Sequence, residues 1–120
     1  MDKSPIPWLD DVAEHDYDAA HNYLSLKFDE KRAAEIVGRM KKAKVTSRRA
    51  NDILRASALP ALPLTDPGVR RDLLKLLTGE KLSPVLVCDR KAGADIADGY
   101  HRVSLAYNVD PFTMVPLRLG

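Results

Sequence analysis

The chain has 120 residues, which is enough for one hydrophobic core and too few for two independent domains of ordinary size. A formal net charge of +2, with 45% hydrophobic and 30% charged residues, indicates neither a disordered chain nor a general nucleic-acid-coating protein. We therefore expect one domain over residues 1–120, in which any contact with nucleic acid needs a local basic patch.

The one cysteine, Cys88, cannot form an internal disulfide, and it ends an apolar run typical of a buried strand. No apolar stretch is long enough to span a bilayer, and residues 1–5 lack the apolar segment of a secretory signal. The sequence predicts a cytoplasmic protein with no membrane partner.

Residues 1–58 are predicted to be mainly helical. Apolar residues between positions 8 and 24 fall partly on helical spacing. A second helix should run from Asp29, as its N-cap, to about Lys42, with acids at its start and bases at its end as the helix dipole favours. Thr46 or Ser47 would cap a third helix. The residues that the third helix should bury are Ala50, Ile53 and Leu54.

The next segment, 58–65, contains two prolines and is predicted to be an extended linker. Asp66 as N-cap, Pro67 at the first helical position and Gly79 just past the end then bracket an amphipathic helix. The inward face of this helix should carry Val69, Leu73, Leu76 and Leu77.

The remaining elements are short strands around one more helix. Residues 84–88 and 95–97 predict a hairpin whose turn is residues 89–93. A helix from about His101 to Asn108 and a strand over 112–119 follow, and Pro116 should place that strand at a sheet edge or at a bulge. This order of elements predicts the α+β class, with a small mixed sheet and packed helices.

The residues best suited to chemistry lie where a strand ends in Asp98-Gly99 and a helix begins with Tyr100-His101-Arg102. The first N–H groups of a helix are unpaired and attract anions, and Gly99 permits a tight turn there. Two basic residues in a first helical turn are unfavourable unless an anion offsets them, and an arginine fork matches phosphate oxygens. The segment predicts a phosphate site.

A structural interpretation of the same segment stays open. Arg102 can pair with Asp98 or with Asp95, and His101 can cap a turn or satisfy a core carbonyl. The segment alone does not decide between the two interpretations.

Residues 84–87, 96–107 and 115–118 together resemble the ParB/sulfiredoxin superfamily. ParB-like domains have a proline before a strand and Gly-Glu-Arg-Arg at the start of an alanine-rich helix, and sulfiredoxins have Gly-Cys-His-Arg there. The most specific part of the match is Gly99-Tyr100-His101-Arg102. The resemblance covers residues 66–119 and leaves 1–58 unexplained.

This resemblance implies a nucleoside triphosphate, with magnesium, held at the turn, since ParB-like domains bind CTP there and sulfiredoxins bind ATP. Gly99, Tyr100, His101 and Arg102 would form the phosphate site, with Ser104 as a further candidate. Tyr100 stands where sulfiredoxins have their reactive cysteine, so we do not expect reduction of a sulfinic acid. Tyr100 and His101 also depart from the ParB pattern, and no helix-turn-helix region follows, so we do not expect a partitioning clamp.

Three functions remain as hypotheses. The first is a nucleotide- or phosphate-binding domain that senses or hydrolyses its ligand, with Asp98 and His101 as candidate catalytic residues. The second is a protein interaction or regulatory module that contacts its partner through the helices of residues 1–58. The third is a nuclease-like activity on nucleic acid, dependent on a metal and on Asp98 or His101.

Two other patterns are interpreted structurally. The three histidines and the cysteine lack the spacing of metal ligands, so no metal site is predicted. Basic residues between Lys41 and Arg55 could touch nucleic acid, but no aromatic residue is interleaved to stack on bases, and a solvated helix end is the favoured interpretation.

Overall fold

A computed structural model describes residues 5–90 and 93–120. The N-terminal residues 1–4, part of the segment considered for a signal, and residues 91–92 of the predicted hairpin turn lie outside this description. The elements are α1 (Glu14–Leu24), α2 (Glu30–Lys42), β1 (Val45–Arg49), α3 (Ala50–Ala56), α4 (Pro67–Leu77), β2 (Val85–Arg90), β3 (Gly93–Asp98), α5 (Tyr100–Val109) and β4 (Met114–Leu119). The predicted α+β class is confirmed.

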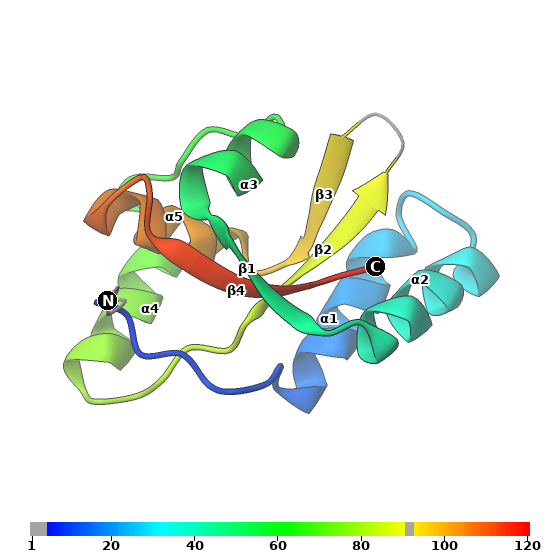
Figure 1. Ribbon diagram of the computed structural model, residues 1–120, viewed down its shortest axis with the longest axis horizontal. Coiled ribbons are helices and arrows are strands. Elements are labelled where there is room, and N and C mark those ends of the chain that lie inside the picture. The colour runs from blue at the N-terminus through cyan, green and yellow to red at the C-terminus, as the bar shows by residue number, and fades with distance from the viewer. Residues whose placement is uncertain (1–4, 91–92) are drawn as a thin grey trace.

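The four strands form one mixed sheet between two layers of helices (Figure 1). Their order is β1-β4-β2-β3, with β2 parallel to β4 and the other neighbours antiparallel. Because side chains alternate along a strand, Val85 and Val87 of β2 join the core under α3, α4 and α5, while Leu86 and Cys88 join the core under α1 and α2. The two cores therefore share the sheet as a common wall.

Helix α2 agrees with the sequence prediction in its bounds and its cap. The Asp29 side chain accepts a hydrogen bond from the backbone N–H of Arg32 at 2.7 Å. The first helix is shorter than the apolar spacing suggested, because α1 begins only at Glu14. Trp8 lies before it and forms an isolated bridge with Leu82, so the early part of the predicted helix is wrong.

The prediction that Thr46 or Ser47 caps a helix is also wrong. Both residues belong to β1, where they pair with Leu117 and Pro116 of β4. Helix α3 begins after Arg49 with no side-chain cap, although it does bury Ala50, Ile53 and Leu54 as predicted. A strand partner about 70 residues away in the chain overrides the local capping pattern, and sequence spacing cannot show such a partner.

Helix α4 begins and ends with the capping residues that the sequence predicts. Asp66 accepts hydrogen bonds from the N–H groups of Gly68 and Val69, Pro67 opens the helix and Gly79 follows its end with a φ of 86°. The inward face is narrower than predicted, because the side of α4 that carries Leu77 faces solvent and leaves that residue 74% exposed.

The prediction of an edge or bulge position for Pro116 is wrong, since β4 lies between β1 and β2. Gly120 directs its N–H and C=O groups toward β2, and by alternation so does Pro116. The pairing with β2 begins only at Leu117, so the missing N–H of Pro116 costs no bond of that ladder. A proline can therefore occupy an inner strand here.

None of the helices in the part of the chain that the structure describes combines the length and the hydrophobicity needed to cross a bilayer.

Replacing the Asp29 cap tests the local basis of α2. We expect Asp29→Ala to lower the free energy of unfolding by about 1 kcal/mol, because the N–H of Arg32 loses its acceptor. Asp29→Asn keeps an acceptor oxygen and should lower the free energy of unfolding clearly less than Asp29→Ala does. Urea denaturation of the three proteins measures both values, and equal losses would show that the charge of Asp29 matters more than its hydrogen bond.

Candidate functional site

A polar pocket of about 280 Å³ lies at the end of the sheet where β3 stops and β2 starts. Its walls come from both helix layers, because α1 contributes one side and α4 and the start of α5 contribute the other. The polar residues of the pocket are His15, Asp16, Asp72, Lys75, Lys81, Ser83, Asp98, His101 and Arg102. The pocket contains three carboxylates and three lysine or arginine cations.

Gly99 is required by the geometry of the turn between β3 and α5. Its φ of 110° lies in the left-handed region that other residues rarely adopt. A Cβ at this position would lie 2.4 Å from Cγ1 of Val85 and 2.8 Å from Nη2 of Arg102. The backbone of Gly99 therefore packs directly against β2 and the arginine, and the prediction of a tight turn is confirmed.

The N-terminus of α5 has no side-chain cap and no acid in its first turn. The first helical hydrogen bond runs from the N–H of Val103 to the carbonyl of Gly99 at 3.0 Å. The N–H groups of residues 100–102 precede that ladder, as in any helix. Helices α2 and α4 each begin with an aspartate that accepts from the first turn, whereas α1 and α3, like α5, have no side-chain cap.

The Arg102 guanidinium is held inside the protein. Its side chain is 11% exposed and donates to Oδ2 of Asp16 at 3.0 Å, to Oδ2 of Asp98 at 2.6 Å and to the carbonyl of Ser83 at 2.8 Å. The pairing with Asp98 that the sequence left open is thus present, whereas Asp95 pairs with other residues. Arg102 joins α1, the end of β3 and the loop before β2.

Two carboxyl groups at the pocket have shifted pKa values. Burial raises the pKa of Asp98, and it outweighs the opposing effect of Arg102, while the neighbouring Asp16 raises the pKa further. Burial also raises the pKa of Asp72, against the opposing charge of Lys75. Both groups bind a proton more readily than an exposed aspartate does, which makes them candidates for acid–base chemistry.

His101 is half-exposed at the pocket, with Nε2 3.5 Å from Oδ2 of Asp66. Its ring lies against Gly68 at the start of α4, where a Cβ would come within 2.4 Å of the imidazole. The missing side chain at Gly68 therefore allows the first turns of α4 and α5 to meet with His101 between them.

Two of the predicted site residues have structural partners instead. The Tyr100 hydroxyl donates to the carbonyl of Pro60, and Tyr100 is not among the residues that line the pocket. Ser104 is fully buried, and its hydroxyl accepts from the N–H of Leu62 at 3.1 Å. Both side chains secure the segment before α4, so the structure brings Asp98, Gly99, His101 and Arg102 to the pocket and leaves Tyr100 and Ser104 away from it.

Four other charged residues of the pocket were not found from the sequence. Asp16, Lys75 and Lys81 come from parts of the chain that no local motif marks. Asp72 did carry a signal, because it lies on the same helical stripe as Val69 and Leu76, where an acid is out of place. It is 8% exposed.

No group of residues that could hold a metal ion is present among the described residues. Comparison with known proteins found no protein family, no curated protein and no solved structure that matches the chain.

Removal of the Arg102 cation tests its structural role. We expect Arg102→Met to lower the free energy of unfolding by about 3–5 kcal/mol, because Asp16 and Asp98 would lose their buried partner. Without the arginine, Asp98 holds its proton in the native state more tightly than in the unfolded chain. The variant should therefore lose stability as pH rises above the ordinary aspartate value and regain part of it in acid.

The control is Arg55→Met, which removes an exposed ion pair with Asp52 and should change stability by less than about 1 kcal/mol at every pH. Urea denaturation between pH 4 and pH 8 compares the two variants. A loss in Arg102→Met that matches the control and does not depend on pH would contradict the buried-pair role.

Proposed function

We propose that the chain binds the phosphate group of a nucleotide or a similar small anion in the pocket at the start of α5. The observation that carries this proposal is the uncapped first turn of α5, which opens at Gly99 into a pocket that also contains Lys75 and Lys81. Backbone N–H groups, the helix dipole and two lysines from other elements then act on one anion. In the ParB/sulfiredoxin proteins that residues 66–119 resemble, the corresponding turn holds nucleotide phosphates, and we propose a relationship to that superfamily.

Only some of the contacts to the phosphate come from the residues that the sequence first suggested. Arg102 already donates to Asp16 and Asp98, so it acts as a positioning residue that fixes the turn. Lys81 has no carboxylate partner among the described residues, and Lys75 lies 3.9 Å from Asp72. These lysines, His101 and the first N–H groups of α5 are the groups that we assign to contact the ligand.

Binding should depend on pH because of the two raised pKa values. Below those values Asp72 and Asp98 are protonated and repel an anion less. An anion in the pocket should in turn favour their protonated forms, so binding takes up protons and tightens as pH falls.

If the ligand is hydrolysed, Asp98 is the group we assign to accept a proton from the attacking water, and magnesium would accompany the triphosphate.

A thermal-shift titration with pyrophosphate, ATP and CTP, each with and without magnesium, tests the proposal. At 100 times the dissociation constant a ligand should raise the melting temperature of a 120-residue protein by about 10 °C. We expect Lys75→Gln/Lys81→Gln to lose most of this shift and to stay folded, since both side chains are exposed or partly exposed.

The charge-matched control for this titration is Lys31→Gln/Arg70→Gln, whose two exposed side chains do not line the pocket. It should keep the full shift. No stabilisation by any of the anions, at either pH 5.5 or pH 7.5, would reject the phosphate site.

A second candidate is a protein interaction module without catalysis. It is favoured by Leu74 and Leu77, which are 60% and 74% exposed on the outer side of α4. Neighbouring exposed leucines on one helix are typical of a contact surface. This surface differs from the helices of residues 1–58 that the sequence suggested. The nuclease-like alternative has no separate observation in its favour.

The cytoplasm is the location that we propose. Cys88 is the one cysteine of the chain and is a free, buried thiol, so the chain has no internal disulfide framework, which suits a reducing compartment.

A further inference from the structure

The charge of the chain is distributed unevenly. Residues 36–51 contain six of the 19 basic residues and none of the 17 acidic ones. The rest of the chain therefore has 13 bases against 17 acids. A net charge of +2 hides a local positive segment on an otherwise acidic protein, and such a segment attracts polyanions.

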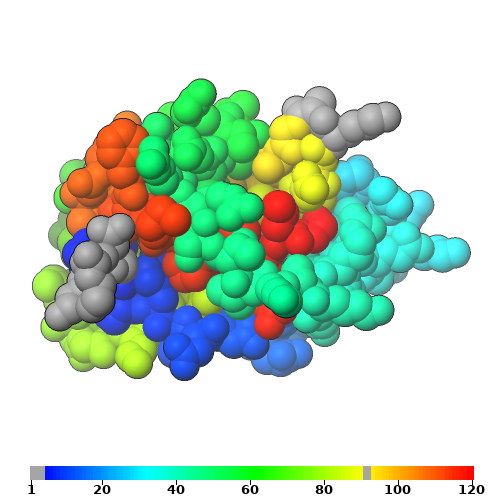
Figure 2. Space-filling view, viewed as in Figure 1, coloured from blue at the N-terminus to red at the C-terminus, as the bar shows by residue number. Residues whose placement is uncertain are grey.

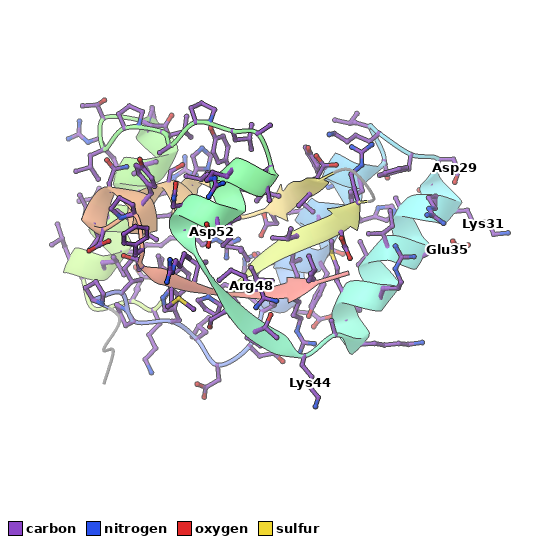
Figure 3. The ribbon with its side chains drawn as sticks, turned by 45° about the horizontal axis from the view of Figure 1, so that its top comes forward. Asp29, Lys31, Glu35, Lys44, Arg48 and Asp52 are labelled. Carbon is purple, nitrogen blue, oxygen red and sulfur yellow. The ribbon has the colours of Figure 1, made fainter. Side chains whose placement is uncertain are left out.

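The structure places the later part of this segment, residues 45–49, on an exposed sheet edge. Strand β1 is the outer strand next to β4, and its burial pattern shows four consecutive exposed residues, 46–49. In Figure 2 the residues from the end of α2 through β1 run across the middle of the visible face. Figure 3 shows Lys44 at the turn just before β1 and Arg48 on the strand itself.

We define the β1 strip as Lys42, Lys44, Arg48 and Arg49. All four are exposed, and none forms an ion pair with a carboxylate in the described ranges, 5–90 and 93–120. Neighbouring bases differ in this respect, because Lys41 lies 3.9 Å from Glu14 and Arg55 lies 3.6 Å from Asp52. The positive charge of the strip is thus left for a partner outside the chain.

An aromatic ring lies at one end of the strip, although the sequence segment contains none. Phe112, from the turn before β4, is 61% exposed, and the Arg49 guanidinium lies 5.1 Å from its ring centroid. Backbone bonds from Ala50 to Thr113 and from Asn51 to Pro111 hold the two segments together. The objection that no aromatic residue accompanies the basic stretch therefore applies to the sequence and not to the fold.

We propose that the β1 strip and Phe112 bind single-stranded nucleic acid. By the alternation of side chains along β1, Arg48 and Arg49 lie on opposite faces of this edge, so a strand of nucleic acid that follows the edge would meet cations on both faces. An exposed ring with a stacked arginine offers a platform for one base. From Lys44 to Arg49 the strand spans about 16 Å, enough for several nucleotides. The hydroxyls of Thr46 and Ser47 lie between the cations and add hydrogen-bond donors.

An acidic peptide is the competing partner, because β1 also presents a free backbone edge. Lysine and arginine on an edge strand oppose the addition of another strand, however, and a peptide gains little from the exposed ring at Phe112. The aromatic contact therefore favours nucleic acid.

Fluorescence anisotropy with a labelled 12-nucleotide single strand of mixed sequence, as DNA and as RNA, tests this proposal on the full chain. Four phosphate contacts predict that affinity falls by about 50-fold between 50 mM and 200 mM salt. With two contacts removed in Lys44→Gln/Arg48→Gln, the fall should shrink to about 7-fold and binding at 50 mM should weaken. The exposed pair Lys31→Gln/Arg71→Gln is the charge-matched control and should behave like the wild type; Figure 3 shows Lys31 far along α2 from Lys44.

The ring is tested by Phe112→Leu, which should weaken binding at least about fivefold at constant salt. Phe28→Leu is the control, because Phe28 also lies near an arginine, Arg90, but is partly buried against the α1–α2 core and is not on the strip. The proposal is overturned by an absence of binding at 50 mM salt, by equal losses in variants and controls, or by a poly-glutamate peptide that binds more tightly than the oligonucleotide. The variant Lys75→Gln/Lys81→Gln should bind the oligonucleotide normally, which separates this result from the phosphate pocket.

Discussion

The Arg102 guanidinium is the contact on which the geometry of the α5 turn depends. It lies between carboxylates from α1 and from the end of β3, and it also binds the carbonyl of Ser83 before β2. Two negative groups so close together would repel each other without this cation, and the cation would be costly to bury without them. The three charges therefore hold each other in place. Because they come from both sides of the sheet, they also tie the α1 layer to the turn at Gly99.

This arrangement gives Arg102, at the start of α5, a structural role within the chain. Arg102 makes the first turn of α5 unfavourable on dipole grounds, yet the offsetting negative charge comes from Asp16 and Asp98 of the chain itself. The position of Gly99, and with it the direction of the free N–H groups, follows from that internal pairing. The groups left to meet a ligand are the helix N-terminus, His101 and the two lysines, while the raised pKa of Asp98 places a protonatable group beside them.

Much of the fold was predictable because it rests on local rules. The caps at Asp29 and Asp66, the β2–β3 hairpin and the turn at Gly99 each depend on residues within a few positions of one another. Apart from the exposed Leu77 on α4, the failures involve partners distant in the chain. Strand β1 forms because it pairs with β4. Trp8 lies outside α1 and forms a bridge with Leu82. The site shows the same division, since Asp98, Gly99, His101 and Arg102 form one local segment. The lysines and Asp16 come close to that segment only in the folded chain. The hydrogen bonds by which Tyr100 and Ser104 anchor the segment before α4 also join residues that are distant in the sequence.

The pocket and the β1 strip would recognise phosphate by different physics. The pocket lies at the end of β3, and β1 is at the opposite edge of the sheet, so the two sites are separated by the inner strands. In the pocket, the largely buried carboxyl groups of Asp72 and Asp98 and the backbone dipoles of α5 act over short distances and are screened less by salt than exposed side chains are. On the strip, exposed side chains act through displaced counterions, and their effect falls steeply with salt. The acids of the chain lie outside residues 36–51, and two of them at the pocket have raised pKa values. A ligand at the pocket should therefore respond mainly to pH, whereas a ligand on the strip should respond mainly to ionic strength.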